Sequence, residues 1–247
     1  MTTYRTYWHL LGDVHEFLKP RTYLEIGVHE GNSLTLAHAE TRIVGVDPAP
    51  KLSRLNHPNW TVVPTTSEDF FREHDVAGLL REPLDLAFVD GLHLFEVALA
   101  DLLSIEQLAH SETVVLIHDV LPISARTSTR QRTTAVWSGD VWKMVVLLRR
   151  HRPDLMVTTL DVGPTGMAII TGFDPTRTQD DTWIAPGIQA MKSASYEDLI
   201  AMGPAKALCV VAGTAANLKR LLPNGLGTGG HYGSNSNGDQ IAGSHYL

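Results

Sequence analysis

Carboxylate and imidazole side chains follow two apolar segments of this sequence, at the point where each segment ends. Asp90 comes directly after Leu84–Val89, and His118 and Asp119 come directly after Thr113–Ile117. If the two segments are neighbouring parallel strands, Asp90 and Asp119 could share a hard divalent cation, Mg²⁺ or another, through oxygen. Successive strand residues point to opposite faces, so only one of His118 and Asp119 is expected to face the site squarely, unless the following loop twists. We favour Asp119 and keep His118 as a further candidate ligand.

A glycine-containing turn lies between two other apolar segments, in the sequence Glu25-Ile26-Gly27-Val28-His29-Glu30-Gly31. Gly27 and Gly31 let the backbone approach a ligand closely, and the helix start expected after them offers free N–H groups. The second apolar segment, Arg42–Val46, ends at Asp47. An acid at that place can hold the two hydroxyls of a ribose. The layout therefore predicts a site for a nucleoside cofactor.

The spacing of the glycines argues against a dinucleotide as that cofactor. A pyrophosphate fingerprint is Gly-x-Gly-x-x-Gly, whereas here three residues separate Gly27 from Gly31. The carboxylate of Glu25 would repel a pyrophosphate and suits a ligand that has no phosphate or carries an ammonium or sulfonium group. Ser67 and Glu68 could contact the same cofactor or simply cap the helix that follows them.

All these polar residues follow segments with the length and composition of strands. Five strands are expected, at Thr22–Ile26, Arg42–Val46, Trp60–Val63, Leu84–Val89 and Thr113–Ile117. Helical spacing is found at Trp8–Leu18, Asn32–Ala39, Phe70–Leu80 and Glu96–His110. Strands that alternate with helices form a parallel sheet with right-handed crossovers. Ligands bind beyond the carboxyl ends of such strands, where the polar residues of this sequence gather.

A long polar loop is expected from Pro122 to Trp137. Its Arg126, Arg130 and Arg132 could clamp an acidic group of a substrate, and Trp137 could line the substrate pocket. A helix is expected to follow from about Ser138 to Arg150.

Beyond that helix, the sequence predicts two more strands, which pair antiparallel at the edge of the sheet, at Leu155–Leu160 and Met167–Thr171. Two further helices are expected, at Tyr196–Ala201 and Ala205–Leu222.

The turn from Glu25 to Gly31 resembles the first motif of the class I S-adenosylmethionine-dependent methyltransferases. The resemblance implies that S-adenosylmethionine is the cofactor. It implies that Asp47 holds the ribose, that Ser67 and Glu68 contact the adenine, and that Glu25 lies near the methionine part.

The segment from Asp90 to His93 and the later pair His118-Asp119 resemble a subgroup of that family that methylates hydroxyls of sugars and natural products. The resemblance runs from about Tyr23 to Gly172. The layout is also similar to metal-dependent catechol methyltransferases, in which acids after the fourth and fifth strands hold the metal. By that similarity Asp90, His118 and Asp119 hold the metal, His93 is the catalytic base, and Asp90 also contacts the cofactor. His118 stands where that pattern has an acid, a departure that leaves the metal open.

The same resemblance implies an α/β fold with a doubly wound, mostly parallel, seven-stranded sheet, helices on both faces and an antiparallel edge strand. The expected division is an N-terminal helix (1–20), a methyltransferase domain (21–175), a C-terminal helical extension (176–222) and a flexible tail (223–247). The tail is expected to be flexible because its Gly, Ser and Asn residues have little with which to pack.

The composition excludes several classes of protein. A net charge of −7 disfavours nucleic-acid binding, which depends on phosphate neutralisation by Lys and Arg. Cys209 is the only cysteine, which excludes an intrachain disulfide and a cysteine-based metal cluster. No apolar stretch approaches the roughly 20 residues that span a bilayer. We therefore expect a soluble cytoplasmic protein with no membrane partner, and its oligomeric state is open, with a homo-oligomer as one option.

The function predicted from these observations is S-adenosylmethionine-dependent O-methylation of a small hydroxylated molecule, a sugar or a natural product, with a divalent metal as an option. One alternative is a cofactor- or metal-binding protein of the same fold with a non-methylating role. A nucleotide-dependent oxidoreductase is a further alternative, which the glycine spacing opposes.

Overall fold

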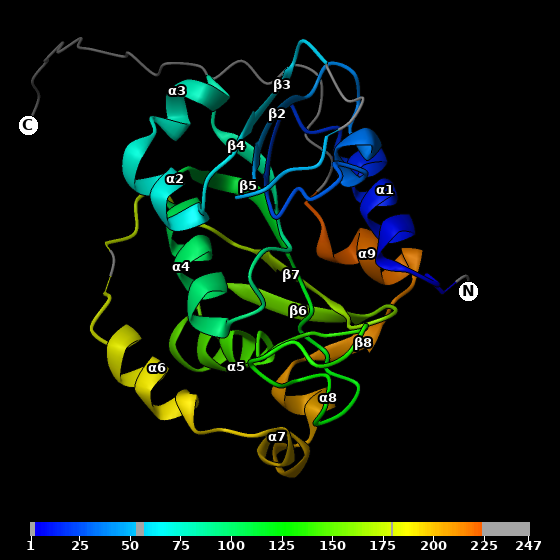
Figure 1. The fold of residues 1–247 in the computed structure, drawn as a ribbon, viewed down its shortest axis with the longest axis vertical. Coiled ribbons are helices and arrows are strands. Elements are labelled where there is room, and N and C mark those ends of the chain that lie inside the picture. Colours follow the sequence, from blue (N-terminus) through cyan, green and yellow to red (C-terminus); the bar gives the residue numbers. More distant parts are fainter. Residues whose placement is uncertain (1–2, 53–56, 179, 224–247) are drawn as a thin grey trace, which may run out of the picture.

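The computed structural model describes residues 3–52, 57–178 and 180–223 of the chain, and a β-sheet runs through its centre (Figure 1). The strands are β1 Thr22–Ile26, β2 Arg42–Val46, β3 Trp60–Val63, β4 Leu84–Val89, β5 Ala109–His118, β6 Met156–Asp161, β7 Met167–Thr171 and β8 Val210–Ala212. Within the described ranges their order is β3-β2-β1-β4-β5-β7-β6-β8. The predicted α/β fold is confirmed, with eight strands where seven were expected.

The direction in which strands are added to the sheet reverses between β1 and β4. From β1 the chain adds β2 and β3 on one side, and it then returns to add β4 and β5 on the other side. These five strands are all parallel, so their carboxyl ends share one edge of the sheet. A crevice forms at such a reversal, and it is the usual ligand site of open α/β sheets.

Helices cover both faces of the sheet (Figure 1). On one face lie α1 Tyr7–Leu18 and α9 Ala215–Leu221, and on the other lie α2 Ser67–Glu73, α3 Val76–Leu80, α4 Phe95–Glu106 and α5 Trp142–His151. Alternate residues of β4 point to the two faces of the sheet: Leu86 and Phe88 pack with α1, whereas Ala87 and Val89 pack with α4. Because both faces are buried, the parallel strands are apolar almost throughout.

Several predicted helices are shorter than the sequence pattern indicated. After the glycine turn, the α-helix expected over Asn32–Ala39 is wrong, since only a 3₁₀ turn, η1 Ser33–Leu36, forms there. The helix predicted over Phe70–Leu80 is two helices. The break falls at Asp75, whose carboxylate accepts a hydrogen bond from Gly78 N at 2.9 Å and caps α3.

Two further helix boundaries differ from the predicted ones. α4 ends at Glu106 rather than at His110, because β5 begins at Ala109. α5 begins at Trp142, four residues after the expected Ser138.

The segment after β7 also differs from expectation. It forms α6 Ile184–Lys192, α7 Tyr196–Met202 and α8 Pro204–Ala207 before β8 and α9. The single helix predicted over Ala205–Leu222 is wrong. Cys209 has a left-handed backbone (φ 51°), and the next three residues pair in parallel with β6. The antiparallel pairing of β6 and β7 is confirmed, but in the described residues β8 rather than that pair forms the sheet edge.

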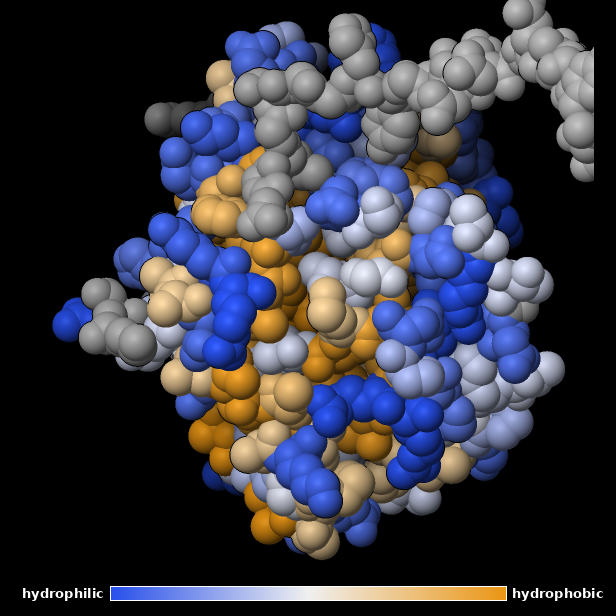
Figure 2. Space-filling view, turned by 180° about the vertical axis from the view of Figure 1, so that it is seen from behind, coloured by the Kyte–Doolittle hydropathy of each residue, from blue (hydrophilic) through white to orange (hydrophobic). Residues whose placement is uncertain are grey.

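Seen from the side opposite to Figure 1, apolar atoms gather over the middle of the molecule and more hydrophilic atoms surround them (Figure 2). None of the helices in the described ranges is long and apolar enough to cross a membrane. The predicted flexible tail lies, from residue 224 onward, outside the described residues.

Candidate functional site

A cavity of about 850 Å³ opens at the carboxyl ends of β1, β2, β4 and β5. Its volume is in the range of ligand pockets, roughly 300–1,000 Å³. Eight predicted site residues line it: Gly27, Asp47, Ser67, Glu68, Asp90, His93, His118 and Asp119. Glu25 and Gly31 do not line it. Tyr7 and Trp8 of α1 line it as well, and nothing in the sequence pattern indicated that the N-terminal helix reaches the sheet edge.

Gly27, after β1, lies in close contact with the backbone that follows β4. Its backbone has φ +95°, and a Cβ atom there would lie 2.2 Å from the carbonyl oxygen of Asp90. Only glycine allows both the dihedral angle and this close approach. Gly31, also at positive φ, closes the turn by donating its N–H to the carbonyl of Val28 at 2.8 Å. Gly31 therefore shapes the turn without lining the cavity.

Glu25 is fully buried beneath the turn. Its carboxylate accepts hydrogen bonds from the hydroxyls of Tyr23, at 2.6 Å, and Ser33. Burial raises the pKa of Glu25 to about 8, against the opposing effect of these two hydrogen bonds. The sequence predicts that Glu25 lies near the methionine part of a cofactor. In the structure its side chain points into the protein and connects β1 to the 3₁₀ turn at Ser33.

Asp47 follows β2 and lines the cavity. Its two carboxylate oxygens accept the N–H of His29, at 2.7 Å, and the N–H of Ala49, at 2.8 Å. These bonds fix the carboxylate while each oxygen keeps a further lone pair. Asp47 is therefore held in place with free acceptor capacity, as a residue that binds a pair of hydroxyls must be.

Ser67 and Glu68 lie in the first turn of α2. The helix cap is Thr66, whose hydroxyl accepts from Asp69 N at 3.2 Å, so the capping alternative does not account for Ser67 and Glu68. Both line the cavity. Burial raises the pKa of Asp101 on α4 to about 6, and a hydrogen bond with Ser67 opposes that rise. Asp101 thus supports this wall of the cavity from inside the protein.

Two carboxylates and two imidazoles meet at the ends of β4 and β5. His93 Nε2 lies 3.1 Å from Asp119 Oδ2 and 3.6 Å from Asp90 Oδ1. His118 Nδ1 donates to Asp90 Oδ1 at 3.0 Å and lies 3.3 Å from Asp119 Oδ2. Burial acts against the ionised form of Asp90, but the charges and hydrogen bonds of the two histidines hold its pKa below the ordinary value.

Both members of the pair His118-Asp119 face the site, because Asp119 has a left-handed backbone (φ 64°) and the loop twists there. Potential ligand atoms of Asp90, His93 and Asp119 all lie within 4.8 Å of one another. This set differs from the predicted metal set in one member, since His93 takes the place of His118. Thr165 donates its hydroxyl to Asp119 Oδ1, which leaves Oδ2 directed at the histidines.

His118 is held by its neighbours in the protein. Its ring packs against Tyr7 with centroids 4.1 Å apart. Burial of the ring favours the neutral form, but the charge of Asp90 and hydrogen bonds to Asp119 and Asp90 outweigh burial and raise its pKa to about 10. His118 therefore contacts both carboxylates through Nδ1, while its Nε2 is buried without a hydrogen-bond partner among the described residues.

Trp137 covers His93 from the long loop after β5. The two rings stack with centroids 4.8 Å apart, and His93 Nδ1 lies 2.8 Å from the carbonyl oxygen of Trp137. Gly139 makes the approach of this loop possible, since a Cβ atom there would lie 1.8 Å from the His93 carbonyl oxygen. Trp137 lines the cavity, and its predicted contact with a substrate stays a prediction.

The three arginines of this loop have different surroundings. Arg130 pairs with both oxygens of Glu96 and with Asp140, at 2.7 Å. Asp140 in turn accepts the N–H of Phe95 at 3.1 Å, so the pairing ties the loop to the start of α4. Arg130 therefore has a structural role. Of the other two arginines, Arg132 lines the cavity and Arg126 does not.

Residues 24–120 match the family model of a methyltransferase domain. The match covers less than half of the chain and includes all the residues predicted to bind cofactor or metal or to act in catalysis. No curated protein sequence matches this chain.

Solved structures share the fold. Cofactor-bound Rv0187 from MTB is 19% identical, with a TM-score of 0.54 over 68% of this chain and 80% of that one. An O-methyltransferase from Bacillus cereus, in complex with SAH, is 18% identical, with a TM-score of 0.53 over 66% and 79%. TomG from Streptomyces achromogenes, an O-methyltransferase involved in tomaymycin synthesis and in complex with SAM, is 19% identical, with a TM-score of 0.54 over 68% and 80%. At these identities the likeness is evidence of a common fold.

Proposed function

We propose that this chain, whose residues 24–120 match the family model of a methyltransferase domain, methylates a hydroxyl oxygen of a small molecule with S-adenosylmethionine as the cofactor. The predicted resemblance to class I methyltransferases is confirmed by the family match and by the shared fold. The observation that carries the finer proposal is that one cavity contains both the Gly27–Asp47 side of the sheet and the cluster around His93.

The residues at the β1 and β2 ends fit S-adenosylmethionine. Gly27 lines the cavity with backbone alone, and Asp47 offers fixed carboxylate oxygens to a ribose. Ser67 and Glu68 line the next part of the wall, where the adenine contacts are proposed. The bound cofactor would supply an electrophilic methyl group on a positively charged sulfur, and the acidic side chains of the cavity favour a cation.

His93 is proposed to take the proton of the acceptor hydroxyl. A hydroxyl is a weak nucleophile near neutral pH, and a positioned base typically speeds its reaction by roughly 10²–10⁴-fold. The carbonyl of Trp137 can only accept, so Nδ1 of His93 carries its hydrogen there and Nε2 is the nitrogen that receives the proton. Asp119, 3.1 Å from Nε2, then stabilises the imidazolium that forms.

A divalent cation, Mg²⁺ or another, is a second candidate occupant of the same cluster. Asp90, His93 and Asp119 supply two carboxylates and an imidazole within 4.8 Å of one another. Such a donor set suits Mn²⁺, Fe²⁺ or Zn²⁺ more than Mg²⁺, which prefers oxygen alone. A metal there would lower the pKa of a bound hydroxyl, and His93 Nε2 would then be a ligand rather than the base.

The test is calorimetric titration of the full chain with S-adenosylmethionine, followed by a methylation assay with tritium-labelled cofactor. Asp47→Asn, which keeps size and removes charge, should weaken binding by about tenfold or more because a charged acceptor is lost. Asp180→Ala is the matched control, since that exposed carboxylate accepts hydrogen bonds from Thr182 and does not line the cavity. Equal affinities of wild type and Asp47→Asn would remove the ribose assignment, and binding without methyl transfer would favour the non-methylating alternative.

Five predictions rest on the sequence alone. These are the small hydroxylated acceptor, the absence of a nucleic-acid partner, the cytoplasmic location, the option of a homo-oligomer, and the division of the chain at 20/21, 175/176 and 222/223. Size-exclusion chromatography with light scattering checks the oligomeric state.

A further inference from the structure

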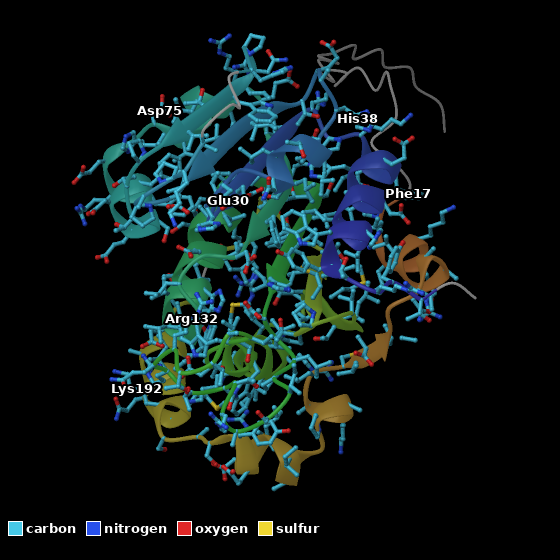
Figure 3. All side chains as sticks on the ribbon, turned by 45° about the vertical axis from the view of Figure 1, so that its right-hand side comes forward. Phe17, Glu30, His38, Asp75, Arg132 and Lys192 are labelled. Carbon is cyan, nitrogen blue, oxygen red and sulfur yellow. The ribbon has the colours of Figure 1, made fainter. Side chains whose placement is uncertain are left out.

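The charges that line the cavity are divided unequally. Carboxylates are numerous on the wall: Glu30, Asp47, Glu68, Asp90 and Asp119. Among the described residues that line it, Arg132 is the one Lys or Arg. Figure 3 labels Glu30 and Arg132, which lie on different parts of the molecule, Glu30 beside the first strands and Arg132 lower, on the loop after β5. The cavity therefore has a large acidic region, in which His118 lies between Asp90 and Asp119, and Arg132 as its one guanidinium among the described lining residues.

The guanidinium of Arg132 has no acidic partner within the described ranges. Its one hydrogen bond to protein there joins Nη2 to the carbonyl of Ala135, three residues along the same loop, at 3.3 Å. Arg130, two residues earlier, shows the contrasting case of an arginine fully engaged by Glu96 and Asp140. Arg132 thus keeps most of its five N–H donors available, and a guanidinium fork matches the geometry of a carboxylate or a phosphate.

Apolar side chains lie exposed on the same cavity wall. Trp8, Leu92 and Val136 line it with exposed fractions of 37%, 57% and 41%. Single exposed apolar residues need no explanation, but three that border one cavity form a surface on which an apolar ligand can pack. Two of them come directly before the residues of the stacked pair in sequence: Leu92 precedes His93, and Val136 precedes Trp137.

We propose that Arg132 binds an oxyanion on the methyl acceptor, and that the acceptor is a hydroxylated molecule with an apolar body and a carboxylate or phosphate group. This inference rests on the proposed function, since it names the substrate class of the same site. The apolar body packs against Leu92, Val136 and Trp8, while Arg132 fixes the orientation that presents the hydroxyl to His93. The acidic region near the strand ends repels the anionic group and so favours a single binding direction.

The experiment compares two probes that differ by one charge. Protein saturated with S-adenosylhomocysteine is titrated calorimetrically with 4-hydroxycinnamate and with its methyl ester, which keeps the ring, the hydroxyl and the apolar chain. 4-Hydroxyphenyl phosphate is a third probe, and it distinguishes phosphate from carboxylate recognition. The wild type should bind at least one anion about tenfold or more tightly than the neutral ester. The preference should fall as salt concentration rises.

Arg132→Gln should remove the preference for the anion and leave the affinity for the ester within about twofold. Arg126→Gln is the matched control, because that exposed arginine lies on the same loop outside the cavity. Equal binding of anion and ester by the wild type, no binding of either anion, or an undiminished preference in Arg132→Gln would overturn the proposal.

The initial titration, with S-adenosylhomocysteine alone, distinguishes an acceptor site from a cofactor contact. The affinity for S-adenosylhomocysteine should be the same in wild type and Arg132→Gln. A loss of that affinity in Arg132→Gln would assign the guanidinium to the carboxylate of the cofactor and overturn an acceptor site. No S-adenosylhomocysteine binding in the wild type would instead overturn the proposed function.

Discussion

His93 and Trp137 make two contacts at once: their rings stack with centroids 4.8 Å apart, and the Trp137 carbonyl accepts the N–H of His93 Nδ1 at 2.8 Å. The first contact sets the plane of the imidazole and the second sets its tautomer. Nε2 is thereby aimed at Asp119, 3.1 Å away. The loop after β5 therefore orients the imidazole of His93 within the cluster at the ends of β4 and β5. The pairing of Arg130 with Asp140 holds that loop in place.

His93→Gln should lower kcat by roughly 10²-fold or more, because the acceptor hydroxyl loses its base. Affinity for S-adenosylmethionine should change little, since the substitution is away from Gly27 and Asp47. Burial favours the neutral ring of His93, but Asp90 and Asp119 raise its pKa above the ordinary 6.5. The base form is therefore populated only as pH rises, and kcat of the wild type should rise with pH through that raised pKa.

The measurement is a pH profile of kcat at saturating cofactor, with calorimetry for cofactor affinity. His74→Gln, at the exposed residue that follows α2, is the control and should keep wild-type turnover. If His93→Gln retained wild-type kcat and the same pH profile, His93 would not be the base.

A divalent cation at the cluster should compete with protonation of His93. Because the raised pKa extends the range over which Nε2 is protonated, Mn²⁺ affinity should increase as pH rises, and binding should release a proton from His93. Calorimetry in two buffers of different ionisation enthalpy counts that proton. Asp119→Asn should weaken Mn²⁺ binding by at least about tenfold. No binding at millimolar Mn²⁺ would exclude the metal and leave His93 as a free base.

Gly27→Ala should disrupt the cofactor turn. The new Cβ atom would overlap the Asp90 carbonyl at 2.2 Å, and the φ of +95° is strained for alanine, at a cost of at least roughly 1–2 kcal/mol. Loss of S-adenosylmethionine affinity and a lower midpoint in urea unfolding should follow. Gly12→Ala in α1 is the matched control, since its nearest neighbour is 4.0 Å away; it should gain up to about 1 kcal/mol. Similar behaviour of both variants would contradict the tight approach of β1 and β4.

Glu25→Gln should make stability less dependent on pH. Burial raises the pKa of Glu25 from 4.5 to about 8, so the folded state holds a proton that the unfolded state has lost between those values. The free energy of unfolding of the wild type should therefore fall as pH rises from 5 to 8, by at most about 4 kcal/mol at roughly 1.4 kcal/mol per pH unit. Glutamine cannot ionise.

Urea unfolding of both proteins at pH 5 and at pH 8 checks this relation. The variant should gain stability relative to the wild type at the higher pH, because only the wild type has a buried acid to deprotonate. A stability difference that is the same at both pH values would mean that Glu25 is ionised in the folded protein.

The sequence by itself determined which strands carry this site and which polar residues stand at their ends. The five parallel strands are apolar because helices bury both of their faces, so each strand was visible as an apolar segment and its polar end was visible as a site. The convergence of Asp47, Asp90, His93 and Asp119 on one edge follows from the parallel direction of those strands. Gly27 could be identified because only glycine tolerates its backbone conformation.

Only the tertiary structure decided which way the side chains at those ends point. His118 and Asp119 both face the site because Asp119 adopts a positive φ, which strand alternation does not foresee. Glu25 turns inward because Tyr23 and Ser33 meet it there. Arg130 and Arg132 are indistinguishable in sequence, yet the fold places two acids beside the first and a cavity beside the second. Residues that approach across a loop share no sequence period, so their contacts arise only from the packing of the whole chain.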